Sequence, residues 1–178
     1  MIKTLIITVL LGFLLVPLSN VFALETDPTA ITRESSYVLF WPIVAGQVKG
    51  ESLYILKNLK ENLREKFIFN DIKKAEYQIT LSEKRVVEAE KLLLEKKDSL
   101  NAKSTLAAAQ DAREKVVQLI QNAKDNNQSM VDVQDRFRIS LEKQKMLLQF
   151  LITQVSSEEK QNLEKNIESL NSVLAKFN

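Results

Sequence analysis

The sequence predicts an all-α protein, an antiparallel bundle of about four to five amphipathic helices. All three glycines and all three prolines lie within the first 50 residues, so residues 51–178 contain no strong helix breaker. The same stretch is rich in Leu, Lys, Glu, Ala and Gln, which are good helix formers. Its apolar residues recur every three or four positions, which is the period of a helix and not of a strand.

The apolar residues form four stripes with this spacing, and each stripe is one side of an amphipathic helix. In chain order the stripes are Ile72, Ala75, Ile79, Ser82, Val86, Ala89 and Leu93; Leu106, Ala109, Val116, Ile120 and Ala123; Phe137, Leu141, Leu148 and Leu151; and Leu163, Ile167, Leu170, Leu174 and Phe177. Arg113 lies on the second stripe. We expect it to snorkel to solvent or to pair with a glutamate of the bundle.

Short polar pairs indicate where the helices begin and end. Asn70–Asp71 can cap a helix, Asp98–Ser99 and Asp125–Asn126 can turn the chain, and Ser156 with Glu159 has the spacing of a capping box. These signals predict helices near 51–68, 71–97, 100–125, 129–155 and 157–177. One continuous helix over 71–125 is the alternative to a break at Asp98.

An unbroken helix over residues 51–178 would be about 190 Å long and would need a partner along its whole length. Folding back on itself buries the same stripes with short connections, which favours the antiparallel bundle. The alternative is an elongated coiled-coil dimer.

The first 23 residues have the layout of a secretory signal peptide. Lys3 is followed by an apolar run over residues 5–16, and the small residues Val21 and Ala23 suit a signal peptidase site. We therefore expect cleavage between Ala23 and Leu24 and an extracytoplasmic location in the periplasm, at the cell surface or in the medium. The alternative is an uncleaved N-terminal helix that anchors the chain, although this run is shorter than the roughly 20 apolar residues of a membrane span.

Residues 24–36 are predicted to be a flexible leader, and residues 37–50 an apolar segment that packs on the bundle of residues 51–178. The stretch "YVLFWP" holds the single tryptophan. We expect it to cover the core as an apolar plug, with Trp41 in an apolar site. The alternative is an exposed interaction surface for a partner or a membrane. The residues concerned are Tyr37, Phe40, Trp41 and Pro42.

Composition and motifs favour a protein that is not an enzyme. The chain has no cysteine and no histidine, which excludes disulfides, thiolate metal sites and the commonest general base. It has no glycine-rich phosphate loop, no GxSxG and no HExxH. We therefore predict no catalytic, cofactor-binding or metal-binding residue. A net charge of +2 gives no indication of a nucleic-acid partner.

Two charged clusters are interpreted as solvated helix surfaces with pairs one turn apart. The first consists of Glu83, Lys84, Arg85, Glu88 and Glu90. The second is a mildly basic face in which acids are interleaved, and it consists of Lys57, Lys60, Arg64 and Lys66 with Glu51, Glu61, Glu65 and Asp71. The alternative for the second cluster is weak attraction to anionic lipid or to a cell-wall polymer.

Several short motifs lie between Trp41 and Glu90. Trp41–Pro42 is an aromatic-proline element, a helix start follows at Ser52, Leu53, Tyr54, Leu56 and Lys57, and a second helix carries Lys73, Lys74, Ala75 and Glu76. These motifs resemble the aromatic-proline, "SPLYxLK" and "KKAEL…AERRLAEAE" elements of an uncharacterised family of exported bacterial all-helical domains, a domain of unknown function. A proline of the second element is missing here. The resemblance implies export and an all-helical fold, and it implies no activity.

Together these observations lead us to expect a non-catalytic exported helical module with a structural or protein-interaction role at the bacterial cell envelope. Its partner would be an unknown envelope protein or a second copy of the chain. Membrane contact is expected only if the N-terminal segment stays uncleaved. The alternative function is an envelope chaperone or sensor that binds unfolded chains or peptides in a groove between helices.

Overall fold

The computed structural model describes residues 35–126 and 128–177. The predicted signal peptide and its cleavage site at Ala23 and Leu24, together with the leader up to residue 34, lie outside the described residues. The described residues form helices and no strand, which confirms the all-α class. In chain order the elements are α2 (Ser36–Phe40), α3 (Tyr54–Lys66), α4 (Asp71–Lys91), the π-helix η2 (Leu92–Lys96), α5 (Ser99–Asp125), α6 (Val131–Gln154) and α7 (Ser157–Leu174).

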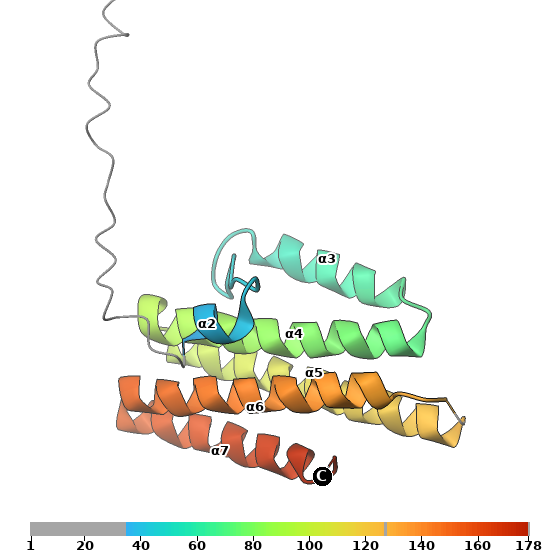
Figure 1. Cartoon of the computed structure of the whole chain (residues 1–178). Coiled ribbons are helices and arrows are strands. Elements are labelled where there is room, and N and C mark those ends of the chain that lie inside the picture. The colour runs from blue at the N-terminus through green and yellow to red at the C-terminus, as the bar shows by residue number, and fades with distance from the viewer. Residues whose placement is uncertain (1–34, 127, 178) are drawn as a thin grey trace, which may run out of the picture. The chain divides into compact units, whose positions relative to one another are not determined.

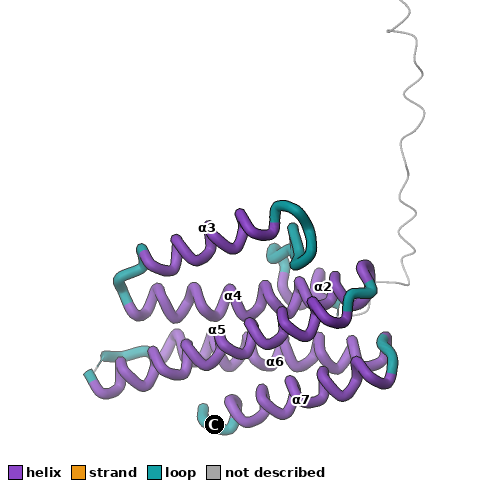
Figure 2. The backbone as a smooth tube through the Cα atoms, turned by 180° about the vertical axis from the view of Figure 1, so that it is seen from behind, coloured by secondary structure: helices purple, strands orange, loops and turns teal. Residues whose placement is uncertain are grey.

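Helices α4 to α7 form the bundle. Short connections join α4 to α5 and α6 to α7 as hairpins, and α4 also packs on α6 while α5 packs on α7 (Figure 1). Seen from behind, α3 lies alongside α4 on the outer side of the bundle (Figure 2). The short helix α2 packs on α4 and α6. The chain therefore folds back on itself, and the elongated alternative is wrong for the described residues.

The predicted stripes face one another in the core. Their completely buried members include Ala75, Ile79, Val86, Leu106, Ala109, Val116, Phe137, Leu141, Leu148, Leu151 and Leu170. Ile72, the first residue of the first stripe, is not in the core, because its side chain remains 37% exposed. At the other end of the chain, Phe177 packs edge-to-face on Phe137 with 5.5 Å between ring centroids. Burial of these apolar side chains is the main stabilising contribution to the bundle.

The break near Asp98 is real, so the alternative of one helix over 71–125 is wrong. Lys97 adopts a left-handed conformation with φ of 54°, and this ends the preceding helix. The Asp98 side chain then accepts a hydrogen bond from the backbone N–H of Asn101 at 3.0 Å and caps α5. The predicted caps at Asn70 and at Ser156 with Glu159 are also present.

The segment 37–50 packs on the bundle through some of its apolar residues only. Phe40 is 4% exposed and Val48 is completely buried. Trp41 is 66% exposed, and its ring packs edge-to-face on the exposed ring of Tyr37 with 5.3 Å between ring centroids. Tyr37 and Trp41 are four positions apart and so share the side of the helical turn that faces away from the bundle. The expectation that Trp41 sits in an apolar site is therefore wrong, whereas Phe40 does cover the core.

Candidate functional site

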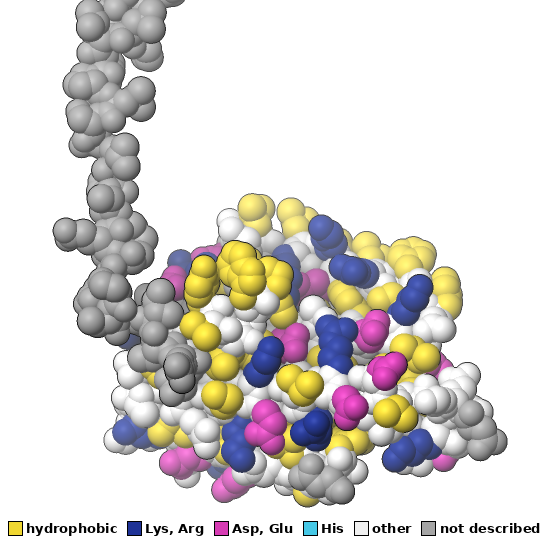
Figure 3. All heavy atoms as spheres, in the orientation of Figure 1, with side chains coloured by type: hydrophobic (Ala, Val, Ile, Leu, Met, Phe, Trp, Pro, Cys, Tyr) yellow, Lys and Arg dark blue, Asp and Glu magenta, His cyan; other side chains and the backbone are white. Residues whose placement is uncertain are grey.

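Helix α3 presents its apolar side to solvent. We call this surface the α3 apolar face, and it consists of Leu53, Ile55, Leu56, Leu59, Leu63 and Phe67. Ile55 is 76% exposed and Phe67 is 72% exposed, and Phe69 just beyond the helix is more exposed still. Figure 3 shows hydrophobic side chains in yellow along the edge of the molecule where α3 lies in Figure 1. A contiguous apolar surface of this kind marks an interaction site more often than a scattered exposed leucine does.

The side of α3 that faces α4 is charged. Arg85 of α4 donates to both carboxylate oxygens of Glu88 at 2.8 Å, and Lys57 of α3 donates to the same carboxylate. Arg85 and Lys84 donate to the carboxylate of Glu61 in α3. Glu88 is completely buried, and Arg85 and Glu61 are only 7% and 8% exposed. The interpretation of these residues as a solvated surface is therefore wrong, and we call the five residues the α3–α4 ion network.

The pKa values in this network reflect burial and ion pairing together. Burial alone would raise the pKa of Glu61, but the hydrogen bond from Lys84 and the charge of Arg85 outweigh it and hold the pKa below its ordinary value. Burial opposes the charged form of Arg85, yet Glu88 and Glu61 raise the pKa of its guanidinium. Burial lowers the pKa of Lys57 despite its bond to Glu88. The network thus uses the acids of α3 and α4 for attachment between the two helices.

The ion network and one further ion pair leave the outward side of α3 with cations and no exposed acid. Lys60, Arg64 and Lys66 are exposed, whereas Glu61 is buried and Glu65 pairs with Lys115 of α5 at 2.9 Å. Acids and bases that alternate in the sequence of α3 therefore lie on different sides of the helix, with the acids toward the bundle. Figure 3 shows dark blue side chains beside the yellow ones over α3. The exposed surface of the helix is apolar and basic.

The residues of the motif resemblance do not form one site. Leu53 and Leu56 belong to the α3 apolar face, whereas Lys57 lies in the network with its ammonium group 5.5 Å from the centre of the Tyr54 ring. The remaining members lie elsewhere: Ser52 and Lys73 are exposed, Lys74 and Glu76 are half-buried, and Ala75 is in the core. A helical projection of residues 54–66 would have separated the acids from the leucines and predicted the two sides of α3.

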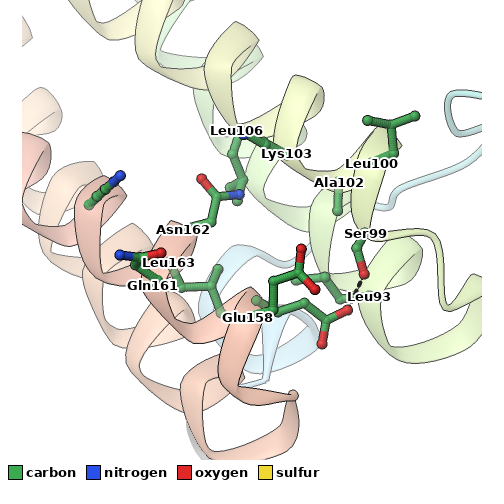
Figure 4. Close-up of a pocket in the computed structure, with 12 residues that line it drawn as sticks. Leu93, Ser99, Leu100, Ala102, Lys103, Leu106, Glu158, Gln161, Asn162 and Leu163 are labelled. Atoms are coloured by element: carbon green, nitrogen blue, oxygen red, sulfur yellow. Dashed lines mark hydrogen bonds between the residues drawn. The ribbon is translucent and has the colours of Figure 1, made fainter.

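A second candidate is a groove between α5 and α7, with a volume of about 440 Å³. Leu93, Leu106 and Leu163 give it an apolar floor, and polar side chains of both helices form its rim. Figure 4 shows Glu158 and Asn162 of α7 on one side of the groove and residues of α5 on the other. This volume lies at the lower end of the range for small-ligand sites. The groove can hold one or two side chains of a peptide.

A smaller hollow of about 280 Å³ lies between the segment around Trp41 and the helices α4 and α6. Glu83 lines it, and burial raises the pKa of this carboxyl group although Ser140, Arg136 and Lys143 favour the charged form. Among the residues that the structure describes, no group of three or more acidic side chains is placed to hold a metal ion. In the same part of the chain, no helix combines the length and hydrophobicity that a membrane span requires.

Arg113 lies in the centre of the bundle and is completely buried. Its Nη1 donates to Oε1 of Gln144 at 2.9 Å, and Gln144 in turn donates to the hydroxyl groups of Ser82 and Ser140. Burial lowers the pKa of Arg113 to about 10. The expectation that Arg113 snorkels or pairs with a glutamate is wrong, since its partner is a neutral amide. We assign it a structural role, because it lies in the core and joins α5 to α6 through Gln144.

Comparison of the chain with family models, with curated protein sequences and with solved structures gives no match.

Proposed function

We propose that the protein is a non-catalytic, exported helical interaction module of the bacterial cell envelope, and that the α3 apolar face is its binding surface. The observation that carries this proposal is the orientation of α3, whose leucines and Phe67 face solvent while its acids face the bundle. The layout of the first 23 residues and the motif resemblance support export.

The arrangement favours binding because it makes the apolar surface permanent. A free amphipathic helix would place its leucines against the nearest core, since burial of each is worth about 2 kcal/mol. In this protein the α3–α4 ion network fixes the opposite rotation of the helix. The apolar side chains therefore stay available to a partner without any rearrangement of the bundle.

Site-specific photocrosslinking tests the proposal. A benzophenone amino acid replaces Leu59 of the α3 apolar face in cells that export the protein, and a second chain carries it at Glu164, an exposed position of α7. We expect an adduct from position 59 and none from position 164 after irradiation. Equal labelling from both positions, or no adduct from position 59 in folded protein, would show that this face is not a binding surface. Intact-mass analysis of the same material tests cleavage before Leu24.

The groove between α5 and α7 favours a second candidate function, an envelope chaperone or sensor that holds apolar side chains of unfolded chains. Leu100 lines the groove and is exposed. The chain should then prevent aggregation of a reduced, denatured client, and Leu100→Asp should abolish this activity while Leu59→Asp should not. Protection that depends on Leu59 instead would assign the client to the α3 apolar face.

A further inference from the structure

We infer that the α3 apolar face binds the surface of an anionic phospholipid bilayer, with α3 lying parallel to the membrane plane. This inference rests on the proposed function and names its partner. It depends on three properties of the described residues: the continuity of the apolar surface, the sign of the charges beside it, and the shape of the helix that carries it.

The apolar surface has the dimensions of an interfacial helix. Helix α3 has 13 residues and is therefore about 20 Å long, too short to cross a bilayer. Ile55, Leu59 and Leu63 lie at successive turns on one side, and exposed Phe67 and Phe69 continue the surface at the C-terminal end. A helix of this kind lies at the boundary between headgroups and acyl chains, with its apolar side chains inserted and its polar side turned away.

The charges favour an anionic surface. Lys60 follows one margin of the apolar side chains and Lys66 lies in the last turn, whereas the guanidinium of exposed Arg64 lies over the Tyr77 ring of α4, 5.0 Å from its centre. Long cationic side chains at such margins can reach phosphate groups while their neighbours insert. Glu61 and Glu65, which would repel an anionic headgroup, are held against the bundle by Arg85 and Lys115. The ion network, which holds Glu61, and the pair of Glu65 with Lys115 therefore keep the two acids of α3 away from the membrane-facing side.

The same charges argue against a second copy of the chain as the occupant. A symmetric dimer through the α3 apolar face would place Lys60, Arg64 and Lys66 of one protomer near those of the other. No acid of α3 is exposed to pair with them. The face is also the outer side of a single helix rather than a groove, so it offers an extended peptide no flanking walls.

Vesicle co-sedimentation tests the inference on the chain as recovered after export. One vesicle preparation contains phosphatidylglycerol with phosphatidylcholine, and the other contains phosphatidylcholine alone. We expect binding to the anionic vesicles at low salt, at least about tenfold weaker binding to the neutral ones, and loss of binding as salt shortens the Debye length.

Two pairs of matched variants separate the contributions of apolar and charged groups. Leu59→Ser with Leu63→Ser should weaken binding about tenfold or more, whereas the control Val131→Ser with Ile139→Ser removes two exposed apolar side chains of α6 and should bind as the wild type does. Lys60→Glu with Lys66→Glu should abolish selectivity for anionic vesicles. Its control, Lys124→Glu with Arg138→Glu, makes the same charge change at exposed positions of α5 and α6 and should bind as the wild type does. Circular dichroism checks that each variant is folded.

Three results would overturn the inference. Equal binding to both vesicle types, or equal loss in the test and control variants, would exclude α3 as an anionic-lipid site. A concentration-dependent dimer that Leu59→Ser dissociates would make a second copy the occupant. Absence of vesicle binding together with a protein adduct from position 59 would leave the proposed function standing with a protein partner, whereas absence of both would remove the proposed function as well.

Discussion

Lys57 of α3 donates a hydrogen bond to the completely buried carboxylate of Glu88 in α4, and this contact joins positions 31 residues apart in the chain. Arg85 holds the same carboxylate from one turn away on α4. The contact fixes the rotation of α3 about its own axis. The orientation of the α3 apolar face is thus a consequence of ion pairing between α3 and α4.

Removing Glu88 should therefore loosen α3. In Glu88→Ala the buried Arg85 and the half-buried Lys57 lose their shared partner, and we expect a loss of about 3 kcal/mol in the free energy of unfolding. Urea unfolding measures this loss, and hydrogen exchange should show reduced protection in α3 before the rest of the bundle. The control is Glu142→Ala, which removes an exposed carboxylate of α6 and should change stability by less than about 0.5 kcal/mol.

Acid should lower the stability of the protein, because it protonates Glu51, which pairs with Lys96. A hydrogen bond from Lys96, supported by the backbone N–H of Val48, lowers the pKa of Glu51 from 4.5 to about 2. A carboxyl group with a lowered pKa in the folded state stabilises the fold above its ordinary pKa, and this stability is lost as pH falls toward the lowered value. The melting temperature of Glu51→Gln should lie below that of the wild type at pH 7, and the two should converge near pH 2. A gap of constant size over this range would contradict the assignment.

An acidic substitution in the core of the bundle should strongly destabilise the protein. Ile79 is completely buried, so Ile79→Asp places an unpaired carboxylate in the core and should cost about 3 kcal/mol or more. Ile139 is an exposed isoleucine of α6, and Ile139→Asp should change the free energy of unfolding by less than about 0.5 kcal/mol. Thermal unfolding followed by circular dichroism compares the two. Similar melting temperatures would mean that the α4 stripe is not in a core.

The buried polar cluster around Arg113 should be a source of instability. Gln144→Leu removes the hydrogen-bond acceptor of a completely buried guanidinium and should destabilise the protein by about 2 kcal/mol. The double variant Arg113→Met with Gln144→Leu removes both groups and should be at least as stable as the wild type. Chemical denaturation measures both variants. A double variant less stable than Gln144→Leu alone would show that Arg113 has further stabilising contacts.

The exposed ring of Trp41 predicts its fluorescence. We expect red-shifted emission and efficient quenching by iodide in the folded protein, because the ring is 66% exposed. Trp41→Ala should hardly change the melting temperature. Phe40→Ala should cost about 3 kcal/mol, because Phe40 is buried against the core. A blue-shifted Trp41 protected from iodide would restore the plug that the sequence suggested.

Local signals in the sequence were sufficient for the N-terminal caps of α4, α5 and α7. The side chains of Asn70 and Asp98 accept from backbone N–H groups three residues later, and the carboxylate of Glu159 accepts from the backbone N–H of Ser156, so neighbouring residues contain the whole interaction. The stripes were predictable for a similar reason, since their spacing follows from the helical period and requires no knowledge of the partner helix. The candidate site was harder to predict from the sequence. Its character depends on which residues of α3 face α4 and which face solvent, and neighbouring residues in the chain do not decide this.

The sequence by itself determined the all-helical class and which side of each bundle helix is apolar. Tertiary structure alone decided that Glu88 and Arg85 are buried, that Arg113 meets Gln144, and that α3 turns its leucines outward. The physical reason is that the sequence alone does not distinguish a charged side chain that is solvated by water from one that is paired with an opposite charge. The partner comes from another helix, and in α3 the residues that meet α4 are the ion-paired ones rather than the leucines.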